Sequence, residues 1–451
     1  MKLRIAVLAV AGCVLVPPSL HAKVTPEEAA TLGTTLTPVG AEKAGNKEAT
    51  IPDWKPYAKR NVPLKGYYPE DPVLDAQQPI FTINKTNMAQ YANQLTAGHQ
   101  YLLKTYDSYK MKVYPSTRDI TWPDTIIKST AENAVKCEII GSDILDNCKL
   151  GFPFPIPKTG AEPVWNHKLK WRGNEVRRVN NQIIVQPSGQ YQITKIVEDV
   201  TFSYSNIGSP VPLTKSSGEF LKYLSETTSP PRLAGTFILV HEKAGTGAEG
   251  RAAWLYSPAL RRIRRAPTVC CDNPYEGTDG HQFYDQVDMF NGVLERYNWK
   301  LIGKKEMFVG YHGNRLGGPQ TKYKDMASPK HLNSDLPRYE LHRMWVVEAT
   351  IKNGTSHTFK KRVMYIDEDA WNIMAVDAYD NRDQLYQFQE GHLSVQPSIQ
   401  ASSTVPEVIY HFTSGRYFIT AMANEDQPND FTMKFAQDYF TSAAVQKRTK
   451  R

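Results

Sequence analysis

The chain has 451 residues, of which 41% are hydrophobic, 11% aromatic and 22% charged. This apolar content is enough for a packed core and excludes a disordered chain. A formal charge of +8 leaves acidic partners open, while 30 prolines and 28 glycines favour many turns over a few long helices.

The first 22 residues have the three-part layout of a secretory signal peptide. A basic start, Met1–Arg4, precedes an apolar run over Ile5–Val16, and the segment ends on the small residue Ala22. The run is too short to cross a membrane. We therefore predict cleavage after Ala22 and export. The stretch Val10–Cys13 also has the shape of a lipoprotein-processing box, so lipidation of Cys13 is left open.

Export changes how the charge is interpreted. Cleavage removes Lys2 and Arg4 and lowers the charge to +6, and four more positive charges lie in a predicted basic tail, 446–451. The folded body is thus nearly balanced. Nucleic-acid binding needs a clustered basic patch, so no nucleic-acid partner is expected.

An oxidising compartment favours disulfide bonds. Cys137 and Cys148 would close a short loop, and we predict that bond. Cys270 and Cys271 are neighbours, and their state is left open between free thiols, metal binding and bonds elsewhere. No Cys/His ligand spacing accompanies them, so no metal or other cofactor is expected.

Along the chain, residues 23–80 are polar and rich in proline, which predicts an extended surface segment. A main domain over 81–445 follows. Within it, apolar residues from Met88 to Tyr106 recur at helical spacing, which predicts a helix over 85–107. A second short helix is predicted over 431–443.

Strands dominate the rest. Short stretches rich in β-branched and aromatic residues are bounded by turn formers, which predicts a meander of antiparallel hairpins. We expect a mainly β fold with some α structure, in which a large curved antiparallel sheet wraps one or more helices. The predicted strands are 191–194, 201–204, 236–240, 251–256, 344–351, 359–366 and 372–378.

Several motifs are weak. Residues 245–250 match GxGxxG, but the sequence that follows is strand-like, so we predict a hairpin loop and no dinucleotide site.

His281, Asp285 and Asp288 would share one face of a helix, which leaves acid–base or metal chemistry open as a minor alternative. A stretch of four arginines, Arg261, Arg262, Arg264 and Arg265, could hold an anionic headgroup or pair with nearby acids.

Around these arginines the sequence resembles a known family. The block Arg251–Pro267, followed by Asp288–Gly292, Tyr297–Met307, Leu336–Thr350 and Tyr365–Trp371, is similar to the proteobacterial domain of unknown function 1329. That family resembles the outer-membrane lipoprotein-sorting (Lol-type) carriers. The resemblance implies an open β half-barrel whose helices plug an apolar cavity for acyl chains, and a neighbouring exporter of the resistance-nodulation-division type with an outer-membrane protein.

These considerations lead to an expected function without catalysis. We expect a periplasmic carrier or envelope accessory protein, in contact with the outer membrane, that binds a lipid or other hydrophobic molecule. A non-carrying adaptor of an exporter complex and an envelope hydrolase or metal enzyme are the alternatives. Strand alternation suggests these cavity-wall residues: Phe237, Leu239, Trp254, Tyr256, Trp345 and Val347.

Overall fold

The structure of the protein is a computed structural model that describes residues 24–56, 60–245 and 250–449. The predicted signal peptide, with Cys13 and Ala22, lies outside these residues. None of the described helices combines the length and the apolarity needed to span a bilayer.

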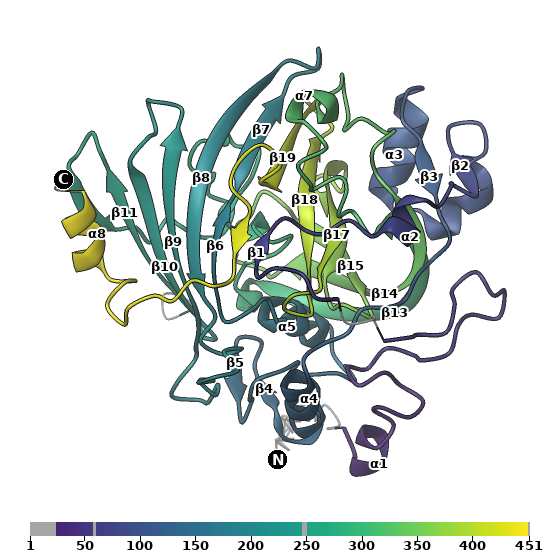
Figure 1. Ribbon diagram of the computed structural model, residues 1–451, viewed down its shortest axis with the longest axis horizontal. Helices are drawn as coiled ribbons and strands as arrows, with labels where there is room; N and C mark the ends of the chain where they lie inside the picture. The colour runs from purple at the N-terminus through teal and green to yellow at the C-terminus, as the bar shows by residue number, and fades with distance from the viewer. Residues whose placement is uncertain (1–23, 57–59, 246–249, 450–451) are drawn as a thin grey trace, which may run out of the picture.

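Strands account for most of the described secondary structure (Figure 1). Their bounds are β1 (Lys65–Gly66), β2 (Phe81–Ile83), β3 (Met111–Val113), β4 (Glu138–Ile140), β5 (Ile144–Asp146), β6 (Glu175–Val179), β7 (Asn181–Val185), β8 (Tyr191–Thr201), β9 (Glu219–Ser229), β10 (Thr236–Lys243), β11 (Arg251–Ser257), β12 (Arg262–Arg265), β13 (Tyr297–Gly310), β14 (Tyr339–Ile351), β15 (Lys361–Asp367), β16 (Ile373–Tyr379), β17 (Leu385–Gln396), β18 (Ala401–His411), β19 (Arg416–Met422) and β20 (Asn429–Asp430).

The helices are fewer and shorter. The α-helices are α1 (Pro26–Ala29), α2 (Pro72–Asp75), α3 (Ala97–Thr105), α4 (Asp124–Lys136), α5 (Ala161–Leu169), α7 (Tyr323–Met326) and α8 (Ser442–Arg448), and the 3-10 helices are η1 (Met88–Gln94), η2 (Tyr284–Gln286) and η3 (Leu294–Arg296).

The sheet consists of two antiparallel meanders joined side by side. Strands β8 to β12 follow one another in the first meander, and β13 to β19 do so in the second. Strand β7 pairs with both β8 and β19 and thereby joins them. A short parallel pairing of β3 with β14 makes the sheet mixed. Among the described strands, β12 pairs only with β11 and β13 only with β14, so the sheet stays open, and it curves around helices as predicted (Figure 1).

Helix α5 lies inside this curve, and all nine of its residues are buried. Val164 and Trp165 have no exposed surface, and both belong to the largest hydrophobic cluster of the described residues. A helix that is buried on every side shows no amphipathic stripe. The sequence analysis missed α5 for this reason.

Two helix predictions need correction. The stretch predicted as one helix over 85–107 is a 3-10 helix, η1, and an α-helix, α3, separated at Leu95 and Thr96. Thr96 caps α3 by accepting a hydrogen bond from the His99 backbone amide at 3.0 Å, which starts a new helix there. The helix predicted over 431–443 is wrong, since α8 begins only at Ser442, capped by Thr441.

The predicted strands mostly lie within observed ones, with one clear error. Phe202 to Tyr204, expected to be strand, form a turn after β8 ends at Thr201. The segment predicted as extended, 23–80, contains only the short elements α1, β1 and α2 among its described residues. The predicted Cys137–Cys148 disulfide is present, and it closes the β4–β5 hairpin at its base.

Candidate functional site

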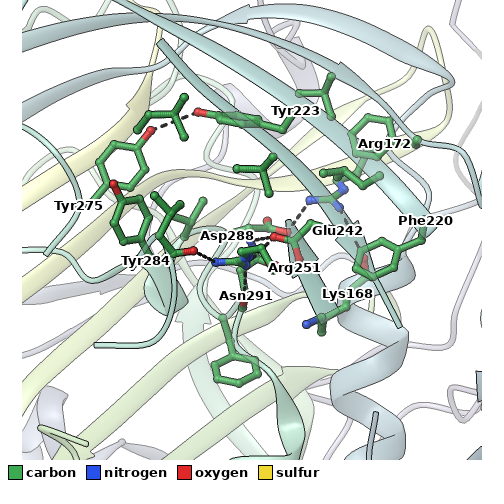
Figure 2. A pocket seen from close by; sticks show the side chains of 18 of the residues that line it. Lys168, Arg172, Phe220, Tyr223, Glu242, Arg251, Tyr275, Tyr284, Asp288 and Asn291 are labelled. Carbon is green, nitrogen blue, oxygen red and sulfur yellow. Dashed lines mark hydrogen bonds and ion pairs between the residues drawn. The ribbon is translucent and has the colours of Figure 1, made fainter. Parts of the chain in front are cut away.

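A cavity lies on the inner face of the first meander, between the sheet and α5 (Figure 2). Its empty volume is about 740 Å³ when the opening to solvent is included. Strands β6 and β8 to β11 form one wall. The residues 266–296, which connect β12 to β13, run over the opposite side and contribute several lining side chains, among them Tyr275, Tyr284 and Phe290. We call this connection the strap.

The apolar wall comes from alternate residues of neighbouring strands. Ile238 and Val240 of β10 face the cavity beside Val200 of β8. Tyr223 of β9 lies next to them, and its hydroxyl is 3.2 Å from the hydroxyl of Tyr275 on the strap. Figure 2 shows these two tyrosines on one side of the cavity and Lys168, Glu242 and Arg251 on the other. The cavity is therefore amphipathic.

Basic side chains outnumber acidic ones in the lining. Lys168, Arg172, Arg178 and Arg251 face two carboxylates, Glu242 and Asp288. Glu242 forms an ion pair with Arg251. Arg178 pairs outside the lining with Glu198.

Asp288 ties the strap to the residues that follow α5. Its Oδ2 lies 2.7 Å from Lys170 Nζ and also accepts a hydrogen bond from Arg172 Nη1. Burial opposes ionisation of Asp288, yet the two cations outweigh burial and hold its pKa below the ordinary value. The same cluster keeps His167 neutral, because burial and Lys170 lower its pKa to about 3.

Lys168 differs from the other three cations. Its Nζ donates to the Gly292 carbonyl at 2.6 Å and lies over the rings of Trp165 and Phe220. Among the described residues no carboxylate lies within ion-pair distance of it. Burial lowers its pKa to about 8, so it is mostly charged at neutral pH. Lys168 thus brings to the cavity a positive charge that no carboxylate pairs directly, although Glu242 and Asp143 favour its charged form from a greater distance.

None of the six residues predicted as cavity wall lines this cavity. Phe237 and Leu239 of β10, with Trp254 and Tyr256 of β11, lie on the opposite face of the sheet, where they pack against Phe440 and Val445 beneath α8. Strand β10 is apolar on both faces. Alternation shows which residues share a face, but it does not show which face lines the cavity. In the second meander, Val347 is in the main core and Trp345 lies under Lys304 Nζ at 4.8 Å.

The four predicted headgroup arginines also lie outside the lining. Arg261, Arg262, Arg264 and Arg265 are exposed on and beside the edge strand β12. The cavity uses other cations, Lys168 and Arg172 foremost. The sequence pattern that could have indicated these cations is Lys168, Lys170 and Arg172, three basic residues at every second position. They lie beside Trp165 and Trp171 in the sequence.

The residues considered for acid–base chemistry are not brought together. His281 packs against His411, and Asp288 pairs with Lys170 and Arg172. Asp285 binds Arg362 at 2.8 Å and His357 at 2.9 Å, and these two groups lower its pKa to about 2 despite burial. Residues 281–288 contain only the three-residue η2, so they share no helix face.

A second buried cluster joins acids and a histidine that are distant in the sequence. His342, Asp367 and Asp369 offer atoms within 4.8 Å of one another. Both oxygens of Asp369, however, bind Arg118, at 2.8 and 2.9 Å. A cation placed there would face the Arg118 guanidinium, so this cluster fits a structural network better than a metal centre.

Cys270 and Cys271 lie in the strap as thiols, with their sulfurs 2.7 Å apart. Arg296 donates from Nη1 to the Cys271 sulfur at 3.3 Å. The hydrogen bond from Cys271 lowers the pKa of Cys270 to about 7. The GxGxxG motif at 245–250 falls on the connection between the antiparallel strands β10 and β11, and its residues 246–249 lie outside the described ones.

Comparisons with solved structures give distant fold likenesses. A putative outer membrane lipoprotein-sorting protein domain from Vibrio parahaemolyticus is 14% identical with a TM-score of 0.42, covering 64% of this chain and 98% of that one. A DUF1329 family protein from Desulfovibrio piger has 14% identity and a TM-score of 0.41, with 60% and 92% covered. A LolA superfamily protein from Nitrosomonas europaea has 11% identity and a TM-score of 0.37, with 63% and 97% covered.

Comparisons of the sequence give higher identity over more of the chain than the comparisons with solved structures. An uncharacterised protein of Pseudomonas aeruginosa is 39% identical over 437 residues, which cover 96% of this chain and 95% of the relative. The family described as "Protein of unknown function (DUF1329)" matches residues 82–446. The resemblance found in the sequence is thereby confirmed, and the chain belongs to the DUF1329 family.

Proposed function

We propose that this protein is a periplasmic carrier that binds one amphiphilic molecule, with its apolar part against the inner face of β8 to β10 and its anionic group near Lys168 and Arg172. The observation that carries the proposal is the lining itself, an apolar wall beside four basic and two acidic side chains. Each buried methylene of the ligand would contribute about 0.8 kcal/mol. An exporter and an outer-membrane protein are the partners we propose for loading and delivery.

A ligand search with a blocked cavity tests the proposal. The protein is purified from its own envelope, and native mass spectrometry is followed by extraction and identification of the bound molecule. We expect a bound amphiphile in the wild type and its loss in Val240→Trp, because the indole would occupy the space beside Ile238. Val200→Trp blocks the same cavity from β8 and should give the same loss.

The matched control is Thr228→Trp, which adds the same side chain at an exposed position of β9. This variant should retain the ligand. A wild-type protein without any ligand that still co-purifies with an exporter would contradict the carrier function and support the adaptor alternative. Circular dichroism of each variant checks that the fold is retained.

Binding of an anionic ligand should weaken as the pH rises through 8. Lys168 has a pKa lowered to about 8, so its positive charge is present below that pH and absent above it. Lys170 titrates near the same value, and Glu407, whose pKa burial raises to about 8, gains negative charge there, so all three change the potential in one direction. A fluorescent alkyl sulfonate, which stays ionised throughout, should show a several-fold higher Kd at pH 9 than at pH 7.

One variant and one uncharged ligand separate the contribution of the Lys168 charge to the pH dependence of binding. Lys168→Met removes its charge at every pH, so its Kd should be raised at pH 7 and should change less between pH 7 and pH 9. An uncharged alcohol of the same chain length should bind the wild type equally at both values. A sulfonate Kd that is constant from pH 7 to pH 9 in the wild type would show that the charge of Lys168 does not contribute to binding.

A further inference from the structure

The hairpin of β11 and β12 ends one edge of the sheet and carries a concentrated positive charge. Strand β12 pairs with β11 and with no other described strand. The turn before it exposes Leu260, whose side chain is 48% exposed, and Arg261 follows directly. Arg262, Arg264 and Arg265 are exposed as well. We call Leu260 and these four arginines the arginine edge.

These arginines lack the partners that other arginines of this fold have. Arg118 and Arg362, both buried, hold carboxylates at 2.8 Å. In contrast, none of the four edge arginines forms an ion pair with any described residue. The exception to their isolation is Arg265, whose guanidinium lies over the Trp254 ring at 5.2 Å. Four unpaired cations within five residues repel one another, and an anionic partner would offset this repulsion.

The neighbourhood of the edge adds positive charge. Helix α8 packs against β12 and ends in Lys447 and Arg448. Lys447 is exposed, whereas Arg448 lies over the Tyr439 ring at 3.9 Å. Among the described residues of the predicted basic tail, Lys447 therefore adds one exposed positive charge on a helix that packs against β12.

The direction of the side chains favours an extended anionic surface over a single small ligand. Arg264 pairs with Leu255 and therefore shares the face of the sheet that carries the cavity, whereas Arg265 pairs with Trp254 on the face beneath α8. The guanidiniums thus project from both faces of one edge, and they do not converge on one point. Leu260 adds an exposed apolar side chain at the tip of the same hairpin.

We propose that the arginine edge docks this protein on an anionic membrane surface. The guanidiniums would lie among the phosphate headgroups, each making paired hydrogen bonds, and Leu260 would enter the boundary between headgroups and acyl chains. The site is separate from the cavity, since none of its residues lines it. Docking here would present the inner face of the first meander next to the membrane.

Vesicle sedimentation tests the docking. We expect the wild type to bind vesicles that contain 30% phosphatidylglycerol and not vesicles of phosphatidylcholine alone, and to lose binding between about 0.15 and 0.5 M salt. The triple variant Arg261→Gln, Arg262→Gln, Arg264→Gln should bind about 100-fold more weakly, because each arginine near an anionic surface contributes about a fivefold change. Leu260→Asp should also weaken binding, at every salt concentration.

The control removes three positive charges elsewhere. Lys322, Lys324 and Arg382 are exposed and form no ion pair with described residues, so Lys322→Gln, Lys324→Gln, Arg382→Gln changes the net charge equally. This variant should bind the vesicles as the wild type does. Equal loss in both triple variants would show a general charge effect and overturn the proposal. Binding of polyglutamate as tightly as of vesicles would overturn it in favour of an acidic protein partner.

Discussion

Replacing Asp288 by Asn should lower the free energy of unfolding by about 3 kcal/mol. The amide keeps the shape of the side chain but removes the carboxylate that Lys170 and Arg172 share. Lys170 has no exposed side-chain surface, so its charge would remain buried without its partner, and breaking a buried pair on one side is costly. Urea unfolding at pH 7, followed by tryptophan fluorescence, measures the difference.

The pH dependence of that difference follows from the pKa of Asp288. Its pKa is lower in the folded protein than in the unfolded chain, so its contribution is complete above the unfolded value, near 4, and is lost as the pH falls through the folded value. The gap between the wild type and Asp288→Asn should thus be constant from pH 5 to 7 and shrink in acid. The exposed pair of Lys360 with Asp383 provides the control, and Asp383→Asn should leave the free energy of unfolding nearly unchanged because solvent screens that pair.

Replacing Arg118 by Ala should detach part of the N-terminal segment. This arginine holds Asp369 with two hydrogen bonds and donates to the carbonyls of Glu42, Ala44 and Pro52 at 2.6 to 3.3 Å. Its loss leaves Asp369 buried without a cation and should cost about 3–5 kcal/mol. Segment 42–52 should then become accessible to trypsin.

Limited proteolysis followed by mass spectrometry checks this result at Lys47, an exposed residue inside the segment. Cleavage there should be faster in Arg118→Ala than in the wild type. Arg416→Ala, at the exposed first position of β19, should leave both the cleavage rate and the stability unchanged. Equal cleavage at Lys47 in all three proteins would show that other contacts hold the segment.

The sheet could be predicted from the sequence because each hairpin is a local feature. Strands such as β10 and β11 are short β-branched or aromatic runs, and few residues separate them in the chain, so their pairing is local. The link between the two meanders is not local. Strand β7 pairs with β19 more than 230 residues later in the chain, and nothing in either stretch specifies that contact.

The site was harder to predict than the sheet for a physical reason. Helix α5, which brings Lys168 to the cavity, is buried all round and has no polar face to mark its period. The arginines of β12 were the most conspicuous basic cluster in the sequence. Because they are adjacent in the chain, they lie together on one exposed edge of the sheet and not in the cavity. The cations of the cavity come instead from α5, the segment after it, β6 and β11, and only folding brings them together.

The strap has a consequence for how the cavity could be reached. Residues 266–296 add no strand to the sheet, and the isolated bridge between Pro274 and Phe283 lies within the strap itself. Side-chain contacts such as those of Asp288 hold it in place. The cavity could therefore open by movement of the strap while every hydrogen bond between strands stays intact. Such a movement would break the contacts between the strap and β11, among them the Ala266 to Ala253 backbone hydrogen bond, and would leave the pairing of the strands unchanged.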